Sequence, residues 1–314
     1  MEKEYILPFL KISKKDVALA GGKGASLGEM TNARMPIPFG FVILASAFDR
    51  FLEESDVGVE IDAQLEKVNY QDTNSVDRYS NVIRDIIADT KMPKDLSEKF
   101  SHEFEKLKCQ FVAVRSSATA EDSDVASWAG ELETYLNTTE KDLLKNIKLC
   151  WSSLFTPRAI FYRYEKKLLD SKVSVAVVIQ KMVQSEVAGI AFTVHPVTRD
   201  KSQMIIEAGL GLGEAVVSGQ ITPDSYILNK KSLEILDKNI SGQERKIIRK
   251  GSGNTWVKVS VTEKFSQKIS DAQIKKLAGI CLDIEKHYKK PQDIEWAIER
   301  GKIFITQSRP ITTL

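Results

Sequence analysis

The spacing of apolar residues divides the chain into a helical first half and a strand-rich second half. Apolar side chains recur at helical spacing over residues 46–108 and 140–169, which predicts helices there. Polar breaks near 72–74 and 91–93 interrupt the first stretch. Residues 270–288 repeat the spacing and predict one more amphipathic helix.

Shorter apolar runs predict strands. They lie at 39–45, 111–115, 134–136, 173–182, 189–194, 204–208, 225–228 and 255–261. Helices and strands that are segregated along a chain indicate an α+β protein. We expect two lobes, residues 1–170 and 171–314, with a ligand site in the cleft between them.

The last two strands, in residues 292–310, predict a β-hairpin with its turn centred on Gly301. This register pairs Ile303 with Glu299, Ile305 with Ala297, and Gln307 with Glu295. Because side chains alternate along a strand, Arg309 shares a face with Gln307. The opposite face should belong to the core, since it carries Ile294, Trp296, Ile298 and Phe304.

The polar face of this hairpin predicts a site for a metal ion and a phosphate. Glu295 offers a carboxylate and Gln307 an amide oxygen, and oxygen ligands suit Mg²⁺. Arg309 adds a guanidinium, which suits phosphate.

Lys23 is a second candidate for phosphate binding. It follows Gly21 and Gly22 and precedes a predicted helix over residues 25–33, where the helix dipole favours an anion. The motif is not a P-loop, because Gly24 follows the lysine in place of Ser or Thr. A solvated lysine in a flexible turn is the alternative reading.

Arg115 ends a predicted buried strand, so its guanidinium must meet an anion. Residues 116–124 after it are small or acidic and predict a loop. The anion is either a ligand phosphate or a carboxylate of this loop, such as Glu121 or Asp122.

A glycine loop at residues 209–214 follows the strand at 204–208. It fails the dinucleotide fingerprint, because Glu214 stands in the place of the third glycine. Glu207 and Glu214 are therefore either ribose or metal contacts, or ordinary strand and helix carboxylates.

The composition argues against some classes of function. The formal net charge is only +2, which gives no case for nucleic acid or an anionic membrane. The three cysteines are widely scattered and suggest buried thiols in a reducing compartment. With no signal peptide or membrane span recognised in the sequence, we expect a cytoplasmic protein.

Four motifs occur in the order found in one family. They are Gly21–Met30 (GGKGASLGEM), Ala113–Asp122 (AVRSSATAED), Gly211–Glu214 (GLGE), and Asp293–Trp296 (DIEW) with Gln307–Pro310 (QSRP). Over about residues 5–312 the chain resembles the nucleotide-binding domain of phosphoenolpyruvate synthase, pyruvate phosphate dikinase and rifampin phosphotransferase. The resemblance implies an ATP-grasp fold that holds ATP and Mg²⁺ between its lobes.

The resemblance also implies roles for individual residues. Lys23, Arg115 and Arg309 match phosphate contacts, and Glu295 and Gln307 match the metal ligands. The adenine segment corresponds to Gln180, Lys181, Met182 and Val183. Gly130 and Thr134 fall in the loop that covers the phosphates, and Glu214 resembles a nucleotide-contacting carboxylate.

In this family ATP is cleaved to AMP, and a histidine on a separate domain takes the β,γ-phosphates. One phosphate is released and the other passes to an acceptor, for which we expect pyruvate, with a rifamycin antibiotic as the alternative. His102, His195 and His287 match no carrier motif, so we expect the histidine-carrier and acceptor domains to be supplied elsewhere. Two other readings are a nucleotide-sensing module without turnover and an ATP-grasp ligase that makes acyl phosphates.

Overall fold

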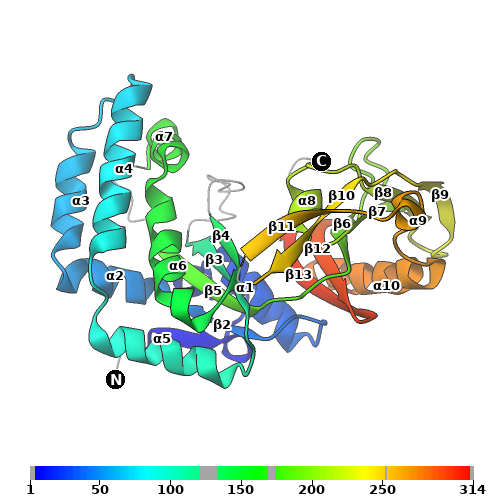
Figure 1. Ribbon diagram of the computed structural model, residues 1–314, viewed down its shortest axis with the longest axis horizontal. Helices are drawn as coiled ribbons and strands as arrows, with labels where there is room; N and C mark the ends of the chain where they lie inside the picture. Colours follow the sequence, from blue (N-terminus) through cyan, green and yellow to red (C-terminus); the bar gives the residue numbers. More distant parts are fainter. Residues whose placement is uncertain (1–3, 120–132, 169–173, 252, 312–314) are drawn as a thin grey trace. The chain divides into compact units, whose positions relative to one another are not determined.

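The computed structural model describes residues 4–119, 133–168, 174–251 and 253–311, which form a mixed helix-and-sheet protein (Figure 1). It divides into two compact units: Met1–Asn32 with Phe39–Met182, and Ala33–Pro38 with Val183–Leu314. The division falls after Met182, later than the expected boundary at residue 170. The reason is strand pairing, because Val175–Lys181 lies in the sheet of the first unit.

The first unit is built on an antiparallel sheet in the order β1-β2-β5-β3-β4. Its strands are β1 (Ile6–Pro8), β2 (Gly40–Ile43), β3 (Val112–Ala118), β4 (Thr134–Thr138) and β5 (Val175–Lys181). β3 runs three residues beyond the predicted end at Arg115, because Ser116, Ser117 and Ala118 continue the ladder with β5. The predicted loop therefore begins later.

Helices pack against one face of this sheet (Figure 1). They are α2 (Ala45–Glu54), α3 (Val57–Leu65), α4 (Thr73–Asp89), α5 (Lys94–Lys106), α6 (Glu140–Ser152) and α7 (Pro157–Glu165). The predicted breaks are confirmed, since the Asp72 side chain caps α4 and α5 begins after Pro93. Two further breaks, at Asp56 and Thr156, were missed. Trp151 is fully buried at the centre of this core.

The second unit contains a six-stranded antiparallel sheet in the order β13-β12-β6-β7-β8-β9. Its strands are β6 (Val187–Phe192), β7 (Gln203–Leu210), β8 (Asp224–Asn229), β9 (Ile235–Asn239), β12 (Gln292–Glu299) and β13 (Lys302–Pro310). A separate hairpin pairs β10 (Arg245–Lys250) with β11 (Gly253–Lys258). The predicted strand at 255–261 ends early, because Ser260 caps the short helix α9 (Val261–Lys264).

The predicted C-terminal helix is confirmed as α10 (Asp271–Tyr288), which packs on β7 and β12 (Figure 1). Ser270 and Gln273 form a capping box at its start, which satisfies two backbone N–H groups. Its buried side is apolar and includes Ile274, Leu277 and Ile284. Within the part of the chain that the structure describes, no helix is long and apolar enough to cross a membrane.

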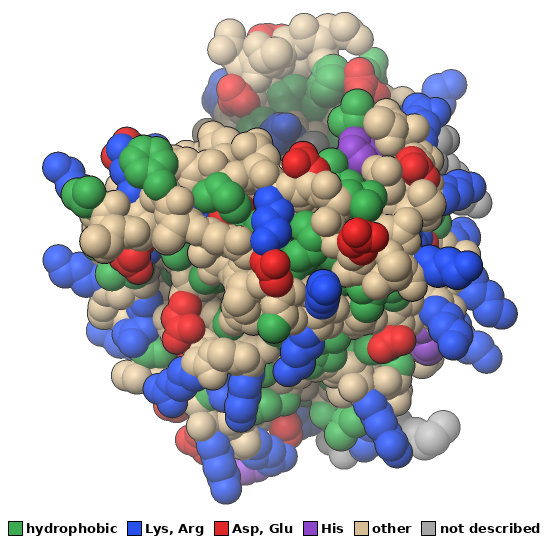
Figure 2. Space-filling view, turned by 90° about the vertical axis from the view of Figure 1, so that its right-hand side faces the viewer, with side chains coloured by type: hydrophobic (Ala, Val, Ile, Leu, Met, Phe, Trp, Pro, Cys, Tyr) green, Lys and Arg blue, Asp and Glu red, His purple; other side chains and the backbone are tan. Residues whose placement is uncertain are grey.

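Charges of both signs are interspersed on the face of the molecule seen in Figure 2. Lys and Arg side chains project around its rim, and acidic side chains lie among them.

Candidate functional site

The β12–β13 hairpin has a register that differs from the predicted one near its turn. A two-residue turn at Arg300 and Gly301, both with positive φ, pairs Ile303 with Ile298 and Ile305 with Trp296. The predicted pairs Ile303–Glu299 and Ile305–Ala297 are therefore wrong by one residue. A β-bulge between Glu295 and Trp296 then takes up one extra residue, Thr306, and restores the predicted pair Glu295–Gln307.

This bulge decides which side chains share a face. On β12 and β13 the polar set is confirmed, because Glu295, Gln307 and Arg309 lie on one side of the sheet with Asp293 opposite Arg309. Phe304 was predicted in the core but lies on this same side, opposite Ala297. Ile303 and Ile305 instead point into the core and are buried.

The face has an apolar end and a polar end. At the apolar end Phe304 packs against Val183, Ala188 and Ala297. At the polar end, Ile190 of β6 lies opposite both Glu295 of β12 and Glu207 of β7. These residues belong to four adjacent strands, so one continuous surface leads from apolar contacts to carboxylates.

Asp293 is a member of the polar end to which the sequence reasoning gave no role. Its carboxylate accepts from Arg309 Nε at 2.9 Å, and Arg309 Nη2 lies 2.8 Å from the same oxygen. Burial raises the pKa of the Asp293 carboxyl, which Arg309 partly offsets and Glu295 reinforces. Alternation along β12 from Glu295 and the predicted pair Glu295–Gln307 already place Asp293 on this face opposite Arg309, so the sequence held a signal for this position.

Glu207 lies on the same face, and its carboxyl group is partly buried like that of Asp293. Burial raises the pKa of its carboxyl, and the nearby Asp293 adds to the effect. Partly desolvated carboxylates with a further negative charge nearby favour a cation beside them. Among the described residues, no three His, Cys, Asp or Glu side chains are arranged to hold a metal ion. Mg²⁺ commonly takes one or two protein carboxylates and completes its shell with phosphates and water, so this donor set fits it.

In the first unit, Arg115 lies on the face of the sheet opposite the helical core. It pairs with Thr134 of β4 and Val178 of β5, and it is 8% exposed. Its Nη1 lies 3.4 Å from the Oε1 of Gln180, which is 2% exposed. The Nε2 of Gln180 is buried and has no hydrogen-bond partner among the residues that the structure describes. Glu121, Asp122 and Gly130 lie outside the described residues.

The glycine motif and the end of β3 interlock. Helix α1 (Val17–Asn32) is kinked at Gly21, which has φ 68° and ψ 169°. The Ser117 hydroxyl enters this kink, donates to the carbonyl of Ala20 at 3.0 Å and accepts from the amide of Gly24 at 3.1 Å. The regular part of the helix thus starts beside β3, earlier than the predicted residue 25.

Lys23 is held at the same junction. Its Nζ donates to the carbonyl of Ser116 at 2.9 Å, next in sequence to Arg115. The structure therefore places Lys23 close to the end of β3, and it joins Arg115, Thr134 and Gln180 in the first unit. Glu295, Gln307 and Arg309 lie in the second unit.

The predicted adenine segment spans the division between the units. Gln180 and Lys181 end β5, and Val183 opens the second unit. The amide of Lys181 donates to the carbonyl of Phe39 at 2.9 Å, and the amide of Met182 to the carbonyl of Phe111 at 3.1 Å. These two N–H groups therefore already have partners within the protein.

Glu214 begins the short helix α8 (Glu214–Val217) directly after the glycine loop. Its side chain is exposed, and Oε2 accepts from Nδ2 of Asn254 at 3.0 Å. Gly211 within the loop has φ 92°, and a Cβ there would lie 2.4 Å from the carbonyl oxygen of Ile247. Only glycine suits that position.

Known proteins are similar in sequence to this chain over nearly its whole length. Residues 17–314 match the family described as the pyruvate phosphate dikinase AMP/ATP-binding domain. The chain is 47% identical to the probable phosphoenolpyruvate synthase of Methanocaldococcus jannaschii, over 97% of this chain and 26% of that protein. A probable phosphoenolpyruvate synthase of Archaeoglobus fulgidus is 46% identical, over 98% of this chain and 42% of that protein.

A relative with a different name is also similar. The rifampicin phosphotransferase of Bacillus cereus is 38% identical, over 99% of this chain and 36% of that protein. The chain thus spans less than half the length of each of these relatives. The resemblance drawn from the four motifs is confirmed: the chain belongs to the pyruvate phosphate dikinase AMP/ATP-binding domain family and is an ATP-binding domain like those of phosphoenolpyruvate synthases.

Proposed function

We propose that this chain is an ATP-grasp domain that binds ATP with Mg²⁺ and presents its β,γ-phosphates to a histidine of another domain. The observation that carries this proposal is the graded face of the second unit, which is apolar around Phe304 and acidic around Glu295. A nucleotide has the same grading, since its base is largely apolar and its phosphates hold the metal. The face therefore suits a nucleotide laid along β12 and β13.

At the apolar end, Val183, Ala188 and Ala297 are buried beneath Phe304, so a base would meet mainly the partly exposed Phe304 ring. Val183 belongs to the segment to which the family resemblance assigns adenine. Because the amides of Lys181 and Met182 are engaged within the protein, adenine contacts would use other groups of this segment.

At the polar end, Glu295 and Gln307 would hold Mg²⁺ through a carboxylate and an amide oxygen. They lie directly opposite each other in the hairpin, so both side chains leave the same face. Mg²⁺ bound there would neutralise the phosphates and favour phosphoryl transfer. Arg309 is positioned on the same face and is tied to Asp293, which fixes the guanidinium.

Lys23 and Arg115 would supply positive charge from the first unit. Arg115 is almost completely buried, so its charge is weakly screened and would act strongly on a phosphate. Phosphoryl transfer depends mainly on positioning and charge neutralisation, which these side chains supply. Thr134 and Gly130 would belong to a loop that covers the phosphates and excludes water.

In the proposed reaction, an imidazole nitrogen of the carrier histidine attacks the β-phosphorus. The bond from that phosphorus to the α,β-bridging oxygen breaks, and AMP leaves. We propose pyruvate as the final acceptor, because relatives named as phosphoenolpyruvate synthases are similar over nearly the whole chain. A rifamycin is the second candidate, favoured by the similarity to the Bacillus cereus rifampicin phosphotransferase.

Calorimetric titration with a non-hydrolysable ATP analogue, with and without Mg²⁺, tests nucleotide binding. The double variant Glu295→Ala, Gln307→Ala should lose the Mg²⁺-dependent part of the affinity. Glu299→Ala is the matched control, since it removes a carboxylate from the same strand at the turn end of the hairpin. Equal binding by the double variant and the control would rule out the metal assignment.

Turnover is tested by adding a separately produced histidine-carrier domain with ATP and following the products by phosphorus NMR. We expect AMP and a phosphohistidine signal. Nucleotide binding without either product would instead support a sensing module, and a hydroxylamine-trapped acyl phosphate would support a ligase.

A further inference from the structure

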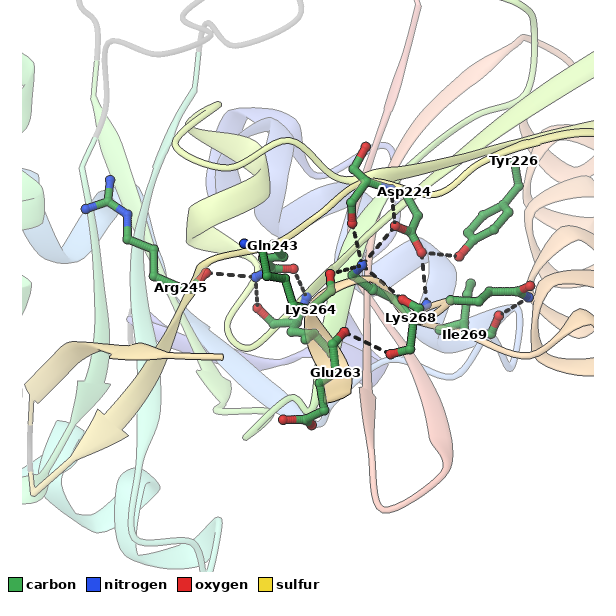
Figure 3. Close-up of polar contacts among 12 residues, drawn as sticks. Asp224, Tyr226, Gln243, Arg245, Glu263, Lys264, Lys268 and Ile269 are labelled. Carbon is green, nitrogen blue, oxygen red and sulfur yellow. Dashed lines mark hydrogen bonds and ion pairs between the residues drawn. The ribbon is translucent and has the colours of Figure 1, made fainter. Parts of the chain in front are cut away.

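A buried ion pair lies within the second unit (Figure 3), and neither of its residues belongs to the β12–β13 hairpin. Lys268 Nζ is 3.1 Å from Asp224 Oδ1, and neither side chain has any exposed surface. Asp224 opens β8, and Lys268 precedes α10. The Tyr226 hydroxyl donates to Asp224 Oδ2 at 2.8 Å.

Backbone groups satisfy the rest of this pair. Asp224 accepts from the amides of Ser241 at 3.0 Å and Lys268 at 2.9 Å. Lys268 Nζ donates to the carbonyls of Ser241 at 2.7 Å and Ser266 at 3.0 Å. A buried ion pair with all its hydrogen bonds made holds the neighbouring backbone in one arrangement. Separating the two side chains would leave a buried charge without a partner. The pair therefore fixes the chain around residues 241–268.

Gln243, which lies beside Lys264 in Figure 3, connects this anchor to the glycine loop through Leu210. Its side chain accepts from the amide of Leu210 at 2.8 Å and donates to the carbonyl of Leu210 at 2.9 Å. Gln243 is 2% exposed, and its backbone amide donates to the carbonyl of Lys264 at 3.0 Å. The same carbonyl lies 3.4 Å from Lys268 Nζ, so the hydrogen bonds run without a gap from Asp224 to Leu210.

The contacts to Leu210 resemble those of a neighbouring strand. At the end of β7 the amide side chain of Gln243 bonds both the N–H and the carbonyl of one residue. The next residues are held by backbone bonds from Gly211 to Glu186 and from Leu212 to Ile247. Glu214 follows at the start of α8, so the position of its backbone depends on how this loop is held, and Asn254 Nδ2 donates to its carboxylate at 3.0 Å.

We propose that Gln243 is a positioning residue that fixes the loop Leu210–Gly213 and thereby aims Glu214 at the bound nucleotide, with the Asp224–Lys268 pair as its anchor. The inference rests on the proposed function, because the nucleotide that Glu214 would contact is the ATP proposed to bind this domain. Gln243 itself touches no ligand and acts through the backbone of Leu210.

Amide hydrogen exchange of the whole chain tests whether Gln243 holds the loop. Gln243→Ala should raise exchange within residues 210–214 by about tenfold or more, while β12 and β13 keep their protection. Gln243→Met keeps most of the side-chain volume and should have the same effect, which separates lost hydrogen bonds from lost packing. Ile284→Ala is the control, since it weakens the buried side of α10, which lies outside the loop in sequence. Unchanged exchange at 210–214 in both Gln243 variants would overturn the proposal.

Nucleotide affinity then tests the route through Glu214. Gln243→Ala should weaken binding several-fold in the unaltered chain but add no further loss to Glu214→Ala. Full additivity of the two losses would refute the route, because independent sites add. Absence of nucleotide binding by the unaltered chain would refute the proposed function instead, and the exchange result would still decide the role of Gln243 in the loop.

Discussion

Gly21→Ala should destabilise the first unit severely, although it adds only one methyl group. Gly21 has φ 68° and ψ 169°, a backbone region that is essentially restricted to glycine. A Cβ there would lie 2.2 Å from the Ser117 hydroxyl oxygen and 2.3 Å from the Ser117 carbonyl oxygen. The backbone must therefore move, and with it Lys23.

The expected loss can be built from two terms. A non-glycine residue in this region costs about 1–3 kcal/mol in backbone strain. Displacing Ser117 also weakens its hydrogen bonds to Ala20 and Gly24, each contributing about 1 kcal/mol. The sum is roughly 3–5 kcal/mol, a large share of the ~5–15 kcal/mol that stabilises an ordinary domain.

Urea unfolding followed by circular dichroism measures this loss, with the two units fitted as separate transitions if they unfold separately. Gly279→Ala is the matched control, because Gly279 lies within α10 and nothing lies within 4 Å of its added Cβ. That change should stabilise the protein by up to about 1 kcal/mol, since alanine favours a helix over glycine.

Ser117→Ala separates the two terms of the Gly21 prediction. Alone it should cost about 2 kcal/mol, because it leaves the buried groups of Ala20 and Gly24 without the hydroxyl. It should not rescue Gly21→Ala, since the Ser117 carbonyl oxygen stays 2.3 Å from the added Cβ. Two results would refute the reasoning. One is that Ser117→Ala restores the stability of Gly21→Ala, and the other is that Gly21→Ala costs less than about 0.5 kcal/mol.

Four further changes test the site and its support. Arg115→Ala should weaken binding of the ATP analogue by about 1–3 kcal/mol in calorimetry, whereas lost stability with unchanged binding would show a structural role. Burial raises the pKa of Glu207 above its ordinary 4.5, so the folded state binds this proton more tightly and loses stability as pH rises through the raised pKa. Glu207→Gln should therefore raise the melting temperature at about pH 7 and leave it unchanged below about pH 4. An equal change of melting temperature at the two pH values would contradict a raised pKa of Glu207. Asp224→Ala should cost about 3–5 kcal/mol in urea unfolding, because it strands the Lys268 charge. Tyr226→Phe removes only one bond to Asp224 and should cost about 1 kcal/mol.

The helices and the polar hairpin face could be predicted because their signals are local. Apolar spacing predicted α10 to within a residue at its start, and alternation along a strand placed Glu295, Gln307 and Arg309 on one face. The prediction of that face succeeded although the turn was placed one residue away. The bulge at Glu295 compensated for the error, and no sequence signal announced it.

Contacts between distant segments could not be predicted in this way. The Ser117 hydroxyl meets Gly21 across nearly a hundred residues of sequence, and the Val175–Lys181 strand joins the first sheet rather than the second. Neither relation leaves a periodic trace, because side-chain spacing records only which face of an element is buried and not which element covers it.

The sequence by itself therefore determined the α+β class, the family and the residue types of the candidate site, because motifs and periodicity are written along the chain. Tertiary structure alone decided that Glu207 shares the face of Glu295, and that Gln243 holds the glycine loop. The physical reason is that strand order, bulges and buried hydrogen bonds depend on which distant segments pair. That choice minimises the free energy of the whole fold rather than of any one segment.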